Sequence, residues 1–140
     1  MTRKDLQNVY NVNVVGPLLL AQALYDNVKA SKGKQIVAIS SGLGQISMNY
    51  SGFNHPAYKC SKAALNMAIK TLALESDSNK DQVIAVAVEP GFVQTDFSGN
   101  KDKATTSVDV SVKNMLTNVI DKKDLKSGTF YKTSGDVSPY

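Results

Sequence analysis

Apolar segments with helical spacing alternate with short apolar runs along this chain. Three segments place apolar residues three and four positions apart, as helices with one buried face do: residues 3–29, 57–76 and 106–122. Three short runs are expected to form strands: residues 35–39, 83–88 and 128–132. The first two runs are continuous and rich in β-branched residues, which is typical of strands buried on both faces. This order predicts an α/β fold in which helices cover both faces of a parallel sheet.

Polar and turn-forming residues set the expected ends of these elements. Thr2, with Asp5 three positions on, forms a capping-box pattern at the start of the first helix. Pro17 lies inside the same helical segment and is expected to kink or split it. Two loops are expected, over residues 40–56 and 92–105. The residues that follow the last strand are expected to form a polar tail.

Three strands make a thin sheet for an α/β protein. One flank of the strand at residues 35–39 would remain an uncovered apolar edge. The sequence therefore predicts a single partial domain over residues 1–140 that belongs to a larger α/β fold.

Composition narrows the function classes. The chain has 140 residues, 42% of them hydrophobic, with one Cys and one His, which argues against a disulfide framework, a Cys-rich zinc site and a metal site of paired histidines. The net charge is +4, but the lysines form no basic stripe with aromatic platforms, so nucleic acid is not an expected partner. No apolar run approaches the roughly 20 residues of a membrane span, and the polar first residues lack the apolar stretch of a signal peptide. A cytoplasmic protein without a membrane partner is expected.

Tyr58 and Lys62 are the most specific chemical signal. They are four positions apart at the start of the second helix, so their side chains share one helical face. An ammonium near a phenol favours the phenolate and lowers the tyrosine pKa from its usual value of about 10. Such a tyrosine can donate a proton to a developing alkoxide or take one from an alcohol. In isolation the pair has a second interpretation, because tyrosine and lysine at this spacing also occur by chance on many helices.

Other polar residues fall at the carboxyl ends of predicted strands, where open α/β sheets form their sites. Ser41 follows the first strand, and the segment Pro90–Thr95 follows the second. Asn13 lies in the first helix close to Pro17, where a kink would free backbone groups to hold a water. Hydroxyl, phenol, ammonium and amide groups are therefore candidates for one site.

Four motifs in chain order resemble those of the short-chain dehydrogenase/reductase superfamily: Asn13, Ser41, Tyr58-x-x-x-Lys62 and Pro90-Gly-Phe-Val-Gln-Thr95. The segments 39–46 and 61–66, with the long loop before Tyr58, are most similar to its carbonyl-reductase subgroup of C-signal and sniffer type. The resemblance covers nearly the whole chain. It implies the C-terminal half of a Rossmann-like, doubly wound parallel sheet with about three strands and flanking helices.

The resemblance also implies a role for each matching residue. Tyr58 would be the catalytic acid/base, and Lys62 would lower its pKa and bind the nicotinamide ribose. Ser41 would polarise the substrate carbonyl, and Asn13 would hold a water that links Lys62 to solvent. Four residues would line the nicotinamide: Pro90, Gly91, Val93 and Thr95. The implied reaction is reduction of a ketone or aldehyde to an alcohol by this Ser-Tyr-Lys-Asn tetrad, with NADP favoured over NAD by the subgroup.

The same resemblance implies how copies of the complete protein associate. In the family, the helices that match residues 3–29 and 57–76 commonly form a dimer interface. A homodimer or homotetramer is therefore expected for the complete protein.

Two features depart from the family pattern. The loop carries extra residues from Met48 to His55, so Ser41 lies further from Tyr58 than in most members; Ser41 is still preferred over Ser40. The Gly-rich turn for the pyrophosphate is also missing, because Gly42-Leu43-Gly44 lacks a third glycine and a following helix. An alternative therefore stays open: a catalytically inactive fragment that serves at most as a dimerisation or interaction module.

Overall fold

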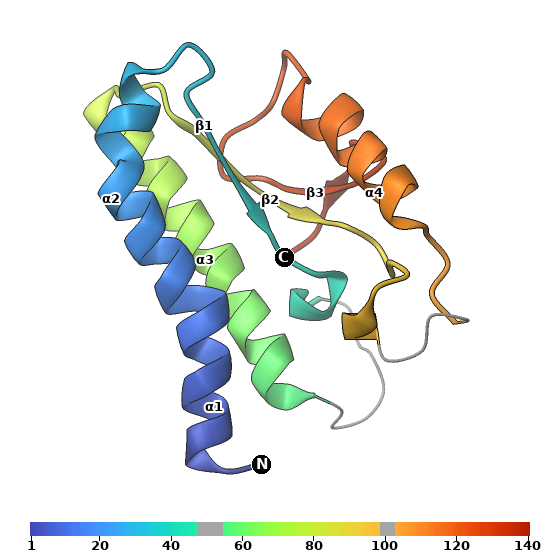
Figure 1. Cartoon of the computed structure of the whole chain (residues 1–140). Coiled ribbons are helices and arrows are strands. Elements are labelled where there is room, and N and C mark those ends of the chain that lie inside the picture. Colours follow the sequence, from blue (N-terminus) through green and yellow to red (C-terminus); the bar gives the residue numbers. More distant parts are fainter. Residues whose placement is uncertain (48–54, 99–102) are drawn as a thin grey trace.

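A computed structural model describes residues 1–47, 55–98 and 103–140 of the chain. A four-stranded sheet runs through its centre (Figure 1). In sheet order the strands are β1 (Gln35–Ile39), β2 (Ile84–Glu89), β3 (Phe130–Lys132) and β4 (Val137–Ser138). The first three strands are parallel, and β4 is antiparallel to β3. The predicted Rossmann-like α/β architecture is confirmed.

Helices flank this sheet on both sides (Figure 1). They are α1 (Arg3–Tyr10), α2 (Gly16–Ala30), α3 (Pro56–Asn79) and α4 (Val108–Met115). The stretch from α1 to α2 lies beside α3, and α4 lies across the sheet from them. No helix within residues 1–47, 55–98 and 103–140 is long and apolar enough to cross a membrane.

Alternate residues of β2 supply two separate cores, because successive side chains of a strand point to opposite faces. The first core lies under α3 and contains Leu65, Ile69, Ala73, Ala85, Ala87 and Phe130. The second lies on the opposite face and contains Val86, Val88, Val119, Leu125 and Tyr131. All four of these β2 residues are fully buried, which confirms the expectation of a strand covered on both faces.

A π-helical turn over Asn11–Val15 separates α1 from α2. Pro17 has no N–H, so the Asn13 carbonyl, four residues before it, cannot be paired as it would be in an α-helix. Gly16 instead donates its N–H to the Asn11 carbonyl, five residues back, which is the hydrogen bond of a π-helix. The predicted interruption near Pro17 is confirmed, and it takes the form of a wider helical turn.

The ends of the helices follow local side-chain chemistry. The Thr2 N–H donates to an Asp5 carboxylate oxygen at 2.7 Å, and the Asp5 N–H donates to the Thr2 hydroxyl at 3.2 Å, so the predicted capping box is present. The third helical segment begins later than expected, because Ser107 caps α4. A second π-helical turn over Leu116–Ile120 completes it.

The tail after β3 differs from the sequence prediction of a polar segment without a strand. Val137 and Ser138 pair with Tyr131 and Phe130 to form β4, which gives four strands where about three were expected. A strand of two residues is too short to show an alternating pattern of apolar and polar positions, so the sequence could not predict it. It forms because β3 provides its hydrogen-bonding partners. Residues 48–54 of the extended loop lie outside the described residues.

β1 lies at one edge of the sheet. It pairs with β2 along its whole length, and no strand among the described residues pairs with its other side. Ile39, at its end, is 48% exposed. The predicted uncovered flank is confirmed. The expectation that this strand is buried on both faces is wrong, because an edge strand is covered less and its first four residues are only half-buried.

Replacing Ile69 with alanine is expected to lower the free energy of unfolding by about 2–5 kcal/mol. Ile69 is 3% exposed, and the cavity would open between α3 and β2. Urea unfolding measures the loss. Val110→Ala, at an exposed position of α4, is the control and is expected to change stability by less than about 0.5 kcal/mol. Equal losses would contradict the assigned core face of α3.

Candidate active site

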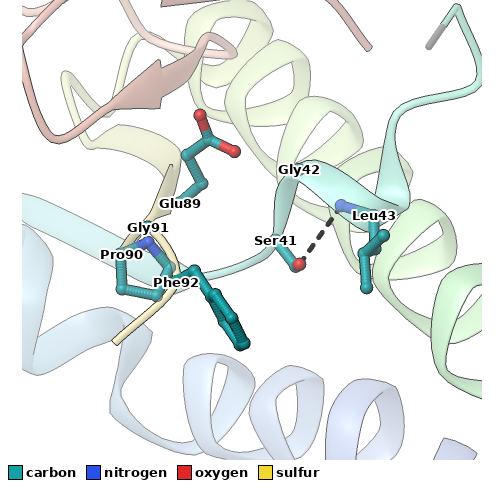
Figure 2. Close-up of a pocket in the computed structure, with 7 residues that line it drawn as sticks. All are labelled: Ser41, Gly42, Leu43, Glu89, Pro90, Gly91 and Phe92. Carbon is teal, nitrogen blue, oxygen red and sulfur yellow. Dashed lines mark hydrogen bonds between the residues drawn. The ribbon is translucent and has the colours of Figure 1, made fainter. Parts of the chain in front are cut away.

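The carboxyl ends of β1 and β2 meet the first turns of α3 at one corner of the fold. Because β1 and β2 are parallel, the segments that follow them leave the same edge of the sheet. Figure 2 shows Ser41 beside the segment that begins at Pro90. A cavity of about 360 Å³ lies there, lined by Ser41, Gly42, Leu43, Glu89, Pro90, Gly91 and Phe92.

Lys62 and Tyr58 lie on one face of α3, as predicted. The Lys62 Nζ is 5.7 Å from the centroid of the Tyr58 ring. The same Nζ donates a hydrogen bond to the Ile39 carbonyl oxygen at 2.8 Å. Lys62 therefore joins the start of α3 to the end of β1, and it brings Tyr58 to the strand end that carries Ser41.

Burial controls the protonation of both side chains. It raises the pKa of Tyr58, while a hydrogen bond to Ser41 acts in the opposite direction. Burial also lowers the pKa of Lys62. The expected lowering of the Tyr58 pKa is therefore wrong for the chain by itself. The ammonium is directed at the Ile39 carbonyl, and desolvation disfavours the charged form of each group.

The two serines at the end of β1 have different surroundings. Ser40 is 2% exposed, and its hydroxyl donates to the Asn66 side-chain oxygen at 2.5 Å. Ser41 lines the cavity, and its hydroxyl accepts from the Leu43 N–H at 3.2 Å. The Ser40 hydroxyl is thus used in a buried hydrogen bond to α3. This favours Ser41 as the serine that contacts a ligand.

Asn13 lies in the π-helical turn and contacts the start of α3. Its side-chain amide donates to the Ser61 hydroxyl at 3.0 Å. Ser61 in turn donates to the Tyr58 carbonyl at 2.7 Å. Asn13 is therefore linked to the helix turn that carries Tyr58, and its role in holding a water stays a prediction.

Gly44 is a site residue that the sequence did not single out. It ends a 3₁₀ turn over Gly42–Gly44 and is buried against α3. A Cβ at this position would lie 2.8 Å from both the backbone carbonyl carbon and the Cβ of Lys62. Because position 44 is a glycine, the turn can pack directly against Lys62. The sequence marked this position only through the pair Gly42 and Gly44, which was compared with a phosphate-binding motif.

The segment after β2 forms the other wall of the cavity. Gly91 has a φ of +82°, in the left-handed region that favours glycine. Val93 forms a parallel bridge with Thr106, and the Thr95 carbonyl accepts from the Ser98 hydroxyl at 2.6 Å. The structure thus brings Pro90 and Gly91 to the cavity, while Val93 and Thr95 follow further along the segment and are not among the residues that line it. In Figure 2 the Glu89 carboxylate points away from the Ser41 hydroxyl and the Phe92 ring.

Phe97 is a second residue that the sequence did not indicate. Its ring centroid is 5.7 Å from that of Tyr58, and the planes are inclined by 45°. The only sequence feature that points to Phe97 is its position in the loop after β2.

Among the described residues, no group of three or more His, Cys, Asp or Glu side chains could hold a metal ion.

Comparison with known proteins shows which family and which proteins this chain is similar to. A family model described as short chain dehydrogenase matches residues 1–106. The chain is 29% identical to C-signal of Myxococcus xanthus over 97% of the chain and 79% of that protein. It is 31% identical to an uncharacterized oxidoreductase of Schizosaccharomyces pombe over 94% of the chain and 56% of that protein.

Solved structures show the same likeness. The NADPH-bound carbonyl reductase from chicken fatty liver is 34% identical, with a TM-score of 0.88. The carbonyl reductase Sniffer of Drosophila melanogaster is 26% identical, with a TM-score of 0.89. Each comparison covers 100% of this chain and 59% of the solved chain. The chain therefore spans little more than half the length of these structures.

Replacing Gly44 with alanine is expected to destabilise the fold by about 1–3 kcal/mol, because the new methyl group would meet the backbone of α3 at Lys62. Thermal or urea unfolding tests this. Gly33→Ala is the matched control, since a Cβ there meets nothing within 4 Å. A Gly44→Ala variant as stable as the control would contradict the close approach.

Proposed function

Because the chain belongs to the short-chain dehydrogenase family, we propose that it carries the catalytic residues of an NAD(P)-dependent reductase. The proposed reaction converts a ketone or aldehyde to an alcohol. One observation carries the proposal: Lys62, which shares a face of α3 with Tyr58, is bonded to the end of β1, where Ser41 lines a cavity at the ends of two parallel strands. Two hydroxyl groups so placed can contact one carbonyl oxygen.

The chain's own residues would hold and protonate that oxygen. Tyr58 has a raised pKa, so the phenol carries its proton at neutral pH and can donate it to a developing alkoxide. Ser41 would hold the same oxygen through its hydroxyl. Lys62, 5.7 Å from the Tyr58 ring centroid, would favour the phenolate that remains after the proton has left.

The residues present fit the nicotinamide end of a dinucleotide. A cavity of about 360 Å³ lies within the roughly 300–1,000 Å³ range of ligand sites, and the wall formed by Leu43, Pro90 and Phe92 is apolar. When bound, NAD(P)H would supply the hydride. Tyr58 and Lys62 would hold its ribose. Pro90 and Gly91 would line its nicotinamide at the cavity, and Val93 and Thr95 are proposed to line it further along the same segment. The NADPH bound to the similar chicken carbonyl reductase favours NADP.

Asn13 is proposed to hold a water that links Lys62 to solvent and returns the proton. The π-helical turn at Asn11–Val15 supports this, since such turns alter the backbone pairing and often mark functional sites. The contact between Asn13 and Ser61 keeps the amide next to the turn that carries Tyr58.

A chimera tests the proposal directly. In it, this chain replaces the matching 59% of the chicken carbonyl reductase, so that the remaining part of that enzyme completes the fold. We expect the chimera to oxidise NADPH with small ketones or aldehydes. Tyr58→Phe and Lys62→Ala are each expected to lower kcat by a factor of about 100 or more, because the proton donor or its partner charge is lost.

Two controls make the result decisive. Cys60→Ala changes an exposed residue of the same helix and is expected to leave kcat unchanged. A cooperative thermal melt with an unchanged far-UV circular dichroism spectrum shows that each variant is folded, and NADPH fluorescence separately measures cofactor binding. The 140-residue chain alone is expected to show no turnover, because no Gly-rich pyrophosphate turn lies in its sequence. A chimera that binds NADPH but retains full turnover with Tyr58→Phe would contradict the assigned acid.

We further propose that the complete protein forms a dimer or tetramer of identical chains through α1–α2 and α3. Both stretches expose apolar side chains, and the two in α3 are seven positions apart, so they share one helical face. The exposed side chains are Val12 (73%), Leu19 (59%), Met67 (66%) and Leu74 (58%).

Introducing charge on this surface is expected to separate the subunits. In the chimera, Met67→Glu combined with Leu74→Glu should shift sedimentation from dimer or tetramer towards monomer, because buried unpaired carboxylates are costly. Val110→Glu, at an exposed position of α4, should leave the assembly unchanged. An unaltered assembly in the double variant would place the interface elsewhere.

A further inference from the structure

The segment that follows the Ser41 turn is fastened to the tail of the chain. The Gln45 side-chain amide donates to the Ser138 hydroxyl oxygen, and the two residues are only 7% and 2% exposed. Ser47 donates twice to the Tyr140 carbonyl oxygen, from its N–H at 3.2 Å and from its hydroxyl at 3.0 Å. Both side-chain contacts join positions 93 residues apart, so they arise from the tertiary fold.

The tail is itself held by the core. β4 pairs with β3, and the Tyr140 ring stacks on Phe130 with centroids 6.1 Å apart and planes inclined by 26°. The Tyr140 hydroxyl donates to the Gly128 carbonyl at 2.8 Å. Phe130 belongs to the cluster beneath α3. Residues 137–140 are thus a fixed support for Gln45 and Ser47.

On its other side the same segment rests on α3. Gly44 approaches Lys62 so closely that no side chain fits between them. Ser41 begins this turn, and its hydroxyl accepts the Leu43 N–H. The segment from Ser41 to Ser47 is therefore held between the catalytic face of α3 and the tail.

We infer that the tail, Val137–Tyr140, is a positioning element of the active site that holds Ser41 opposite Tyr58 through Gln45 and Ser47. The inference rests on the proposed function for its catalytic meaning. The tail touches neither Tyr58 nor Lys62 through any hydrogen bond among the described residues, so its influence passes through the segment that it supports.

The test uses the 140-residue chain and needs no turnover. Tyrosine labelled with ¹³C at the ring carbon that bears the oxygen reports the titration of Tyr58, assigned with Tyr58→Phe. Ser138→Ala removes the acceptor of the Gln45 amide, and Ser47→Ala is a milder variant that removes one donor to Tyr140. In each, the amide of residue 47 is expected to exchange about tenfold faster. The pKa of Tyr58 is expected to rise further as Ser41 moves away.

Ser134→Ala is the matched control. This exposed serine lies in the turn between β3 and β4, where its hydroxyl is hydrogen-bonded to Asp136, and its replacement is expected to leave both readouts unchanged. If the Tyr58 titration is unchanged in both test variants, the inference is overturned. It is also overturned if amide exchange rises uniformly through the chain, because that marks a general loss of stability. Neither outcome depends on hydride transfer, so a failure of the proposed function is measured separately in the chimera.

Discussion

A buried ammonium at the end of β1 is the contact on which the site depends. Lys62 is 9% exposed, and its Nζ donates to the Ile39 carbonyl. A buried charge is costly unless it is paired or hydrogen-bonded, so this bond favours one arrangement of α3 against the strand end. Tyr58 lies one helical turn before Lys62, so the same arrangement places Tyr58 at the strand end that carries Ser41. The site is therefore built by the same contact that docks the helix.

Small residues make this docking possible. Ala85 and Ala87 present little volume to α3, and Gly44 lets the turn after Ser41 touch the helix at Lys62. Because protein interiors are closely packed, each of these positions limits how far the helix lies from the strand ends. The distance between the phenol and the serine hydroxyl is thus a property of the core as well as of the two residues themselves.

Much of the fold could be predicted from the sequence because its signals are local. The helical spacing of apolar residues predicted α3, and continuous β-branched runs predicted β1 and most of β2. The four-residue spacing of Tyr58 and Lys62 predicted that both lie on one face of α3. The fourth strand, the contact of Phe97 with Tyr58 and the support of Gln45 by Ser138 depend on residues distant in sequence, and no local period marks them. The Tyr58 pKa was predicted in the wrong direction, because spacing reveals a neighbouring charge but not the burial that opposes it.

In the proposed reaction, the Ser41 and Tyr58 hydroxyls act on the same oxygen atom. A double-mutant cycle in the chimera with the chicken carbonyl reductase, using Ser41→Ala, Tyr58→Phe and both together, measures this directly through kcat. The effects of residues that act as a unit are strongly non-additive, so we expect the double variant to be about as slow as the slower single variant. Effects that multiply independently would contradict it.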